Sequence, residues 1–289
     1  MNFLPEGRGQ ENLFIKGGIV EGTVISLDGV LNMMVDFGNG NFGVIPRDEG
    51  AIGIDSGETK EIALISRTGK PVRGVVMSTD PLIVSRRMLQ KACQTQRISR
   101  LVPGDIIEAR VTHLESYGAF VDIGCGIPSL LPIDSISVSR IAHPSDRLSV
   151  GDDIYAVVKS VMPDGKITIS QKELLGTWEQ NASRFTAGET ATGIVRSTEN
   201  YGIFIELTPN LAGLAEYRDG IFADDVVSVF IKSLIPEKMK VKLAIVGRLE
   251  DKDYPPDPRF AGEYYISSGH LNHWKYSPND CIKTIESIF

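Results

Sequence analysis

Two pairs of aromatic side chains recur in this 289-residue chain, each pair spaced by three positions. Tyr117 precedes Phe120, Tyr201 precedes Phe204, and a glycine follows each tyrosine. Strict alternation along a strand would direct the two rings to opposite faces, but a glycine that permits a bulge or bend would bring them to one surface. Adjacent exposed rings form a platform on which unpaired bases stack. The recurrence therefore predicts a surface for single-stranded nucleic acid, in preference to a phenylalanine that is merely covered by a loop.

The two phenylalanines lie in segments that read as strands with one apolar face. In residues 119–123 every second side chain is apolar, and Phe120 and Asp122 occupy the opposite face. Residues 203–207 repeat this pattern, and residues 33–37 show a fainter version of it. A large aromatic side chain opposite a core face needs a reason. We therefore expect Phe120 and its counterpart in the later segment to be exposed for binding.

The stretch around the first ring pair is one copy of an internal repeat. Its sequence, GDIIEARVTHLESYGAFVDIG, recurs in altered form at residues 188–207 and more faintly at 17–38. The spacing of about 85 residues is too long for a solenoid repeat and suits a small autonomous domain. The chain is therefore predicted to hold three domains and an extension, with boundaries at 1–96, 97–185, 186–250 and 251–289.

In the second copy this stretch is followed by SLLPIDSIS, VGDDIYAVVKSV and KITISQKEL. Together these segments, roughly residues 101–175, resemble the S1 motif of the bacterial ribosomal protein S1 family. The resemblance extends to the third copy through LAGLAEY and DDVVSVFIKSLIPEKMKVKLAIV, and to the first mainly through its glycines, VDFG, FGVIPRDE and PLIVSRRML. It implies five-stranded OB-type barrels that bind single-stranded RNA on the face carrying the aromatic pair. The expected fold class is all-β: three tandem OB-type barrels with short linker helices and a C-terminal helical extension.

Basic side chains are expected to flank the rings. Lys166 and Thr168 alternate with core residues at the end of the second copy, and Lys240 and Lys242 do the same in the third. The closing strand of an OB barrel lies near the aromatic strands, so we expect these side chains to contact the RNA backbone.

The loop DSISVSRIAHPSDRLSVGD of the second copy is much longer than its counterpart in the third. Modules similar to this one place a short helical turn there, beside the RNA face. Arg140 and Arg147 in this loop therefore either reach phosphates or only solvate the loop, and both readings stay open.

Two positions depart from the family pattern. Many members carry a histidine after a Leu-Leu pair, where this chain has Pro132 in the second copy and Glu216 in the third. A carboxylate beside the rings would repel phosphate. The second copy is therefore expected to be the better RNA-binding module.

The first copy lacks the ring pair, because Leu31 and Met34 stand where the other copies have tyrosine and phenylalanine. We expect this module to dock on another protein. The alternative is residual RNA contact through Arg47, Lys70 and Arg73. Its predicted elements are strands near residues 18–27, 31–37, 41–45 and 61–66, a last strand near 71–76 or 82–85, and a helix over 86–96.

The segments after the second and third copies are predicted to be helical. A linker helix over residues 172–184 would pack Trp178 against a domain. In the extension, Ser277 reads as an N-cap of a closing helix with an apolar side of isoleucines, docked on the third module or between modules. His270, His273 and Cys281 lack a fourth ligand at a familiar spacing, so no metal site is predicted.

Composition limits the class of protein. The net charge of −7 argues against a tight duplex binder driven by counterion release, although stacking needs less charge. No apolar run approaches the length of a membrane-spanning helix, and three scattered cysteines suggest reduced thiols in a cytoplasmic protein. The chain shows no phosphate loop, nucleophile elbow or metalloprotease motif, so we expect no catalytic residues.

The expected function is non-enzymatic binding of single-stranded RNA, without a cofactor or a membrane partner. The resemblance implies a role in translation, in which the modules hold mRNA near the small ribosomal subunit. Two alternatives stay open: a protein-interaction adaptor whose modules have weak or lost RNA affinity, and an RNA-binding regulator of transcription or RNA decay.

Overall fold

The computed structural model describes residues 14–162, 165–249 and 263–289. The chain divides into two compact units. The first holds the N-terminal barrel, the helix after it and the short loop 124–127, and the second holds the remainder. Each unit is described by itself below.

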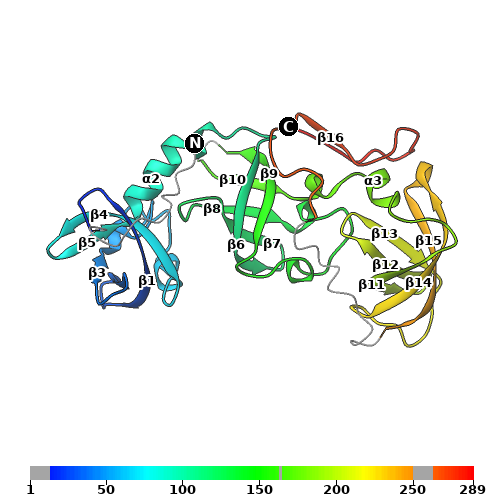
Figure 1. Ribbon diagram of the computed structural model, residues 1–289, viewed down its shortest axis with the longest axis horizontal. Helices are drawn as coiled ribbons and strands as arrows, with labels where there is room; N and C mark the ends of the chain where they lie inside the picture. Colours follow the sequence, from blue (N-terminus) through cyan, green and yellow to red (C-terminus); the bar gives the residue numbers. More distant parts are fainter. Residues whose placement is uncertain (1–13, 163–164, 250–262) are drawn as a thin grey trace. The chain divides into compact units, whose positions relative to one another are not determined.

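Three closed five-stranded barrels make up most of the described chain (Figure 1), and all three have the same strand order. This confirms the predicted all-β class with tandem OB-type barrels. The first barrel consists of β1 (Ile19–Leu27), β2 (Met33–Asp36), β3 (Phe42–Ile45), β5 (Leu82–Ser85) and β4 (Pro71–Thr79), in order around the barrel. The second consists of β6 (Ile106–Glu115), β7 (Gly118–Asp122), β8 (Pro128–Pro132), β10 (Ile167–Ser170) and β9 (Asp153–Val161). The third consists of β11 (Thr190–Glu199), β12 (Gly202–Thr208), β13 (Leu211–Ala215), β15 (Lys240–Arg248) and β14 (Val226–Ile235).

A parallel contact between the third and fifth strands closes each barrel. In the second barrel Thr168 of β10 pairs with Leu130 of β8, and in the third Lys242 of β15 pairs with Leu214 of β13. All other strand pairs are antiparallel. Paired residues on neighbouring strands point to the same side of a sheet. The register therefore lines up one outward-facing row of side chains across each barrel.

The barrel interiors are filled by the alternating apolar residues that the sequence pattern indicates. In β7 and the residue after it, Ala119, Val121 and Ile123 are fully buried, and Ile203 and Ile205 are fully buried in β12. The intervening phenylalanines are half-buried on the outer side. Branched aliphatic side chains suit such small closed interiors because they fill them in few rotamers.

The helices differ in part from expectation. Helix α2 (Arg86–Gln96) is confirmed, and the Ser85 hydroxyl caps it by accepting a hydrogen bond from the Met88 amide at 2.8 Å. The predicted strand at 61–66 is wrong, because that segment is the short helix α1 (Ile62–Ile65). Both alternatives for the last strand, β4 and β5, are strands, and they complete the barrel without it.

The linker after the second barrel contains less helix than predicted. It consists of a 3₁₀ turn (Lys172–Leu175) and α3 (Trp178–Ala182), separated by Gly176 with φ of 84°. A residue in this left-handed region ends the first turn. Trp178 is buried, which confirms that it packs against a domain.

The extension is a two-stranded hairpin, and the predicted closing helix is wrong. Strand β16 (His273–Lys275) pairs with β17 (Glu286–Ile288), and the Ser277 hydroxyl accepts a hydrogen bond from the amide of Ile285 at 2.8 Å. Ile282, predicted for the apolar side of a helix, is 90% exposed. The apolar positions are too few to bury one side of a free helix, so the backbone pairs with β16 instead.

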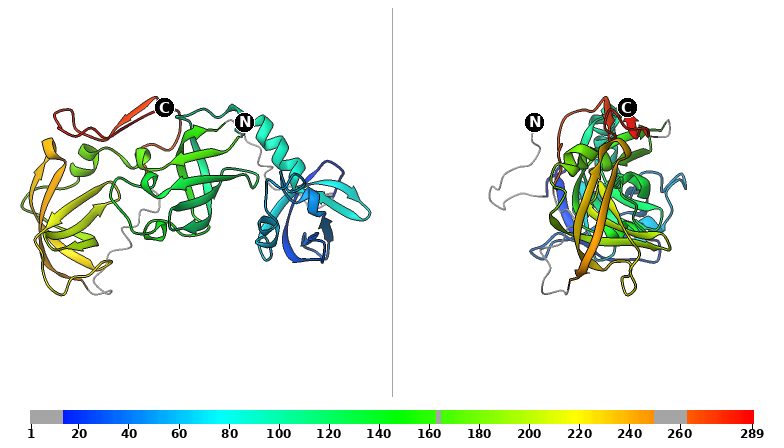
Figure 2. Two further views of the ribbon diagram at one scale, coloured as in Figure 1. Left: turned by 180° about the vertical axis from the view of Figure 1, so that it is seen from behind. Right: turned by 90° about the vertical axis from the view of Figure 1, so that its right-hand side faces the viewer.

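The extension lies along both barrels of the second unit (Figure 2). The Leu271 amide donates to the Gly104 carbonyl of the second barrel at 2.8 Å, and Trp274 and Tyr276 join the apolar cluster of the third barrel. Its two histidines pair with carboxylates, His270 with Asp105 and His273 with Glu286, at 2.8 and 2.9 Å. Within the three described stretches, no helix is long and apolar enough to cross a membrane.

Candidate nucleic-acid interface

The two ring pairs take nearly the same geometry in the second and third barrels. The ring centroids of Tyr117 and Phe120 are 6.2 Å apart with planes at 89°, and those of Tyr201 and Phe204 are 6.1 Å apart at 85°. The tyrosines are 54% and 70% exposed. The edge-to-face contact holds each phenylalanine while it leaves the tyrosine ring open to solvent. The structure thus brings together the rings that the sequence pattern paired.

The glycine between the rings acts differently from expectation. No register shift lies at Gly118, and Tyr117 belongs to the turn before β7, so strand alternation does not apply to it. The glycine is needed for close approach: a Cβ on Gly118 would lie 2.5 Å from the Leu131 carbonyl oxygen. A Cβ on Gly202 would lie 2.6 Å from the equivalent carbonyl oxygen in the third barrel. Such contacts exclude any side chain.

A third ring joins the platform of the second barrel. His113 of β6 pairs in register with Phe120, and their rings stack with centroids 6.4 Å apart and planes at 27°. Its Nε2 atom lies 2.8 Å from a carboxylate oxygen of Glu115. Sequence reasoning missed His113, because a bulge in β6 between Val111 and His113 sets the face on which the imidazole lies.

The outward row that crosses each barrel at the ring phenylalanine is called the ring row here. In the second barrel it consists of His113, Phe120, Leu130 and Thr168. Lys166, predicted to flank the rings, is exposed just before β10. The predicted position of Thr168 beside the rings therefore agrees with the strand register, although its contact with RNA stays a prediction.

The ring row of the third barrel ends in a cation. It consists of Ser197, Phe204, Leu214 and Lys242. Lys242 is exposed, and so is Lys240, which lies two residues earlier on β15. Alternate residues of a strand share a face, so both ammonium groups lie on the side of the phenylalanine ring.

The carboxylate of Glu216 is paired in the structure. The Lys232 ammonium donates to it at 2.9 Å, and this hydrogen bond lowers the pKa of the Glu216 carboxyl from its ordinary value. Its charge is therefore compensated locally at neutral pH. This finding weakens the expected repulsion of phosphate by the third module.

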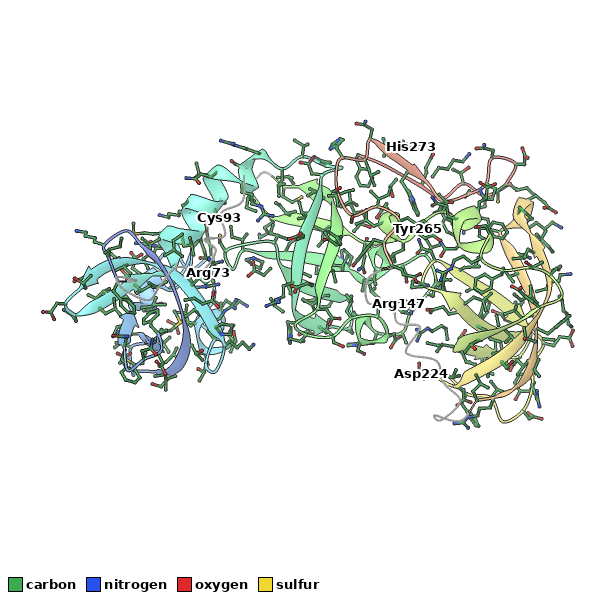
Figure 3. All side chains as sticks on the ribbon, viewed as in Figure 1. Arg73, Cys93, Arg147, Asp224, Tyr265 and His273 are labelled. Atoms are coloured by element: carbon green, nitrogen blue, oxygen red, sulfur yellow. The ribbon has the colours of Figure 1, made fainter. Side chains whose placement is uncertain are left out.

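The two arginines of the long loop 133–152 have opposite environments. Arg140 is exposed, so contact with a phosphate stays a prediction for it. The side chain of Arg147 is only 4% exposed, and its Nη2 atom donates to Glu206 of the third barrel at 2.6 Å. Figure 3 labels Arg147 on the side of the second barrel that meets the third. The predicted phosphate contact of Arg147 is wrong, because its guanidinium is buried in an ion pair within the protein.

The first barrel presents no ring and no cation in the equivalent row. That row consists of Ser26, Met34, Val44 and Ile83. Phe42, elsewhere on this barrel, is exposed but has no paired ring among the described residues. The absence of a platform agrees with the sequence, and docking of another protein on this module stays a prediction.

Comparison with known proteins gives a family for the second barrel. Residues 101–172 match the S1 RNA binding domain. The small ribosomal subunit protein bS1 of Leuconostoc lactis is 28% identical over 211 residues, which cover 66% of this chain and 49% of that protein. The corresponding protein of Staphylococcus saprophyticus is 26% identical over 222 residues, or 70% of this chain and 56% of the other.

Among solved structures, a multidomain protein with nucleic acid binding domains from Streptococcus pneumoniae is 14% identical with a TM-score of 0.26. The match covers 81% of this chain and 75% of that one, and at this TM-score it supports no statement about how the barrels are arranged. The chain spans about half the length of the curated relatives it matches. The sequence of the second barrel thus matches the S1 RNA binding domain, and the chain is similar to the bacterial small ribosomal subunit protein bS1.

Proposed function

We propose that the protein binds single-stranded RNA on the ring rows of its second and third barrels. The observation that carries this proposal is the repeated edge-to-face pair of a tyrosine and a phenylalanine on the outer face of both barrels. Each base that stacks on such a ring is worth roughly 1–3 kcal/mol, and every base has a face to stack. A platform of this kind favours unpaired RNA over a duplex, whose bases are already stacked.

Exposed cations support the same surface. Lys166 is exposed just before β10 in the second barrel, and in the third Lys242 belongs to the ring row and Lys240 lies two residues before it. We expect the backbone of a stacked strand to pass beside these ammonium groups. Lysine binds phosphate as a point charge, so these contacts position the strand without reading its sequence. The similarity to bS1 supports a cytoplasmic role in translation, in which the modules hold mRNA at the small ribosomal subunit without catalysing a reaction.

The test is fluorescence anisotropy with a labelled, unstructured RNA of about 12 nucleotides. We expect Phe120→Ala to weaken binding by about 1–3 kcal/mol, and Phe204→Ala to weaken it further when both are changed. Phe42→Ala is the matched control, since it removes an exposed phenylalanine that has no tyrosine partner. Circular dichroism of each variant shows whether its barrels stay folded.

Three outcomes would count against the proposal. They are no binding at low salt, equal binding by wild type and the double variant, and an equal loss in Phe42→Ala. The first two would mean that the ring pairs do not bind RNA, and the third that the loss of binding is not specific to the ring pairs.

A further inference from the structure

The long loop of the second barrel ends in a buried ionic contact with the third barrel. Arg147 and Arg196 both donate to the same carboxylate oxygen of Glu206, each at 2.6 Å. The three side chains are 4%, 8% and 3% exposed. Arg147 belongs to the second barrel, whereas Arg196 and Glu206 belong to β11 and β12 of the third barrel. Burial of the Arg147 side chain lowers the pKa of its guanidinium.

A second contact holds the same loop at the turn between β12 and β13. The Val138 amide donates to the side-chain oxygen of Asn210 at 2.9 Å, and the Ser139 amide donates to the Pro209 carbonyl at 3.2 Å. The side-chain amide of Asn210 donates in turn to two carbonyls of the linker, Lys172 and Gly176, at 2.8 and 2.9 Å. Asn210 is fully buried. The Asn210 side chain of the third barrel therefore forms hydrogen bonds with both the loop and the linker of the second barrel.

The C-terminal hairpin adds a third contact. The Tyr276 hydroxyl donates to the carbonyl of Asn210, and the Tyr276 carbonyl accepts from the Trp178 amide at 3.0 Å. The residues before β16 pair with the second barrel at Gly104, so the segment spans both barrels. The second and third barrels are thus joined at three places that come from different parts of the chain.

We propose that the second and third barrels form one rigid RNA-binding body, in which a single strand engages both ring rows at once. This inference rests on the proposed function. The set of contacts made by loop 133–152, by Asn210 and by the hairpin is called the clasp here. Opening the clasp would break the ion pair of Arg147, the hydrogen bonds of Asn210 and the apolar packing of the hairpin at the same time, so the linker is not a free hinge. An RNA strand bound to one ring row then meets the second ring row at a high effective concentration. Because the two barrels are already held together, binding does not cost the conformational entropy of a flexible linker.

The length of the loop follows from this role. In the third copy the equivalent loop between β13 and β14 is short. The loop of the second copy is longer because it reaches the next barrel, and its 3₁₀ turn (Pro144–Asp146) directly precedes Arg147. The Asp146 carbonyl also accepts a hydrogen bond from Arg196.

The first experiment measures rigidity without RNA. Spin labels carried by unnatural amino acids replace Glu108 in the second barrel and Lys238 in the third, both exposed positions. Double electron–electron resonance on the full chain is expected to give a narrow distance distribution. Arg147→Glu, which places a second carboxylate against Glu206, is expected to broaden it. Arg147→Lys, which keeps a cation against Glu206, is expected to leave the distribution narrow.

The second experiment measures RNA length. One OB barrel covers about 4–16 nucleotides, so an RNA of about 6 reaches one ring row and an RNA of about 24 reaches both. We expect the longer RNA to bind wild type about 100-fold tighter. In Arg147→Glu this ratio is expected to fall below about 10-fold. Affinity for the short RNA should stay unchanged, whereas a direct phosphate contact by Arg147 would lower it. Lys283→Glu is the control, because it makes the same change of charge at an exposed position of the hairpin.

The outcomes separate this inference from the proposed function. A broad distance distribution in wild type, or an unchanged one in Arg147→Glu, would overturn the rigid body even if RNA binds. Tight binding of short RNA with no gain for long RNA would overturn the shared strand and leave the proposed function intact. Failure of both RNAs to bind would overturn the proposed function and the shared strand together.

Discussion

An acidic residue lies two positions after the ring phenylalanine in both the second and the third barrel, but its burial differs between the two. Asp122 in the second barrel is half-buried, opposite Arg110 of β6. Glu206 occupies the same place in the third barrel, but it lies beneath the loop of the preceding module and is almost fully buried. Its charge is compensated by Arg196 of the adjacent strand β11 and by Arg147 of the second barrel, which lies 59 positions away in sequence. The role of this residue therefore depends on a neighbouring module.

Removing the carboxylate of Glu206 is expected to destabilise the second unit. Glu206→Gln leaves two buried arginines without an anion, and breaking a buried ion pair in this way costs about 3–5 kcal/mol. The measurement is urea denaturation followed by tryptophan fluorescence, since Trp178 and Trp274 are both buried in the apolar cluster of the third barrel. Glu216→Gln is the control: its carboxylate is exposed and its substitution should leave the midpoint unchanged. Equal midpoints for both variants would contradict the importance of the buried cluster.

The ring pairs depend on the hairpin that presents them. The tyrosine lies in the turn between two strands, and the glycine after it begins the second strand. In both barrels a backbone carbonyl of the third strand occupies the space that a Cβ on this glycine would need. The close approach of the third strand places the phenylalanine and its tyrosine on one side of the sheet. The geometry of the platform is thus a property of three strands and not of the two rings alone.

Gly118→Ala is expected to disturb this arrangement in the second barrel. The added methyl group would lie 2.5 Å from the Leu131 carbonyl oxygen, so β7 and β8 must separate. Overpacking of this kind costs about 1–3 kcal/mol, and RNA affinity should fall by an amount similar to that of Phe120→Ala. Thermal denaturation and RNA anisotropy measure the two effects. Gly29→Ala is the control, because a Cβ there meets nothing within 4 Å. If Gly118→Ala bound RNA like wild type, the close approach would not be needed for the platform.

At the scale of the whole molecule, the net charge does not by itself indicate whether the protein can bind RNA. The chain has a net charge of −7, yet exposed cations lie beside the ring rows. Stacking supplies sequence-tolerant affinity that requires few phosphate contacts. An acidic chain is therefore compatible with RNA binding when its cations are placed locally, and the cost is a lower affinity.

The salt dependence of RNA binding is expected to be shallow. The exposed cations proposed to contact phosphate are Arg140, Lys166, Lys240 and Lys242. Single strands lose affinity with a logarithmic slope of about −0.7 per phosphate contact, so the slope should not be steeper than about −3. Lys242→Met should make the slope about 0.7 less steep, and anisotropy titrations at four or more salt concentrations measure both values. A slope steeper than about −5 would show that a larger basic surface, not the ring rows, dominates binding.

Much of the site was predictable because it is encoded within single hairpins. The alternation of apolar residues, the recurring tyrosine and phenylalanine, and the repeat spacing are local patterns, and hydrophobic burial enforces them in every copy. In the first copy the segments of β4 and β5 were predicted only as alternatives for one strand, and residues 61–66 were predicted to be a strand where the structure has helix α1. The closing helix of the extension was mispredicted because an N-cap signal there competes with pairing to a strand that precedes it.

The sequence by itself determined the three barrels, their outward rings and the loss of the platform in the first one. Only the tertiary structure decided that His113 joins the platform and that Arg147 does not contact phosphate. It also decided that the second and third barrels are joined. These facts depend on a bulge, on a loop that reaches the next barrel, and on a hairpin that spans both barrels. The residues involved are distant in sequence, so no local pattern reports which of them meet; desolvation and charge pairing select their partners when the barrels pack.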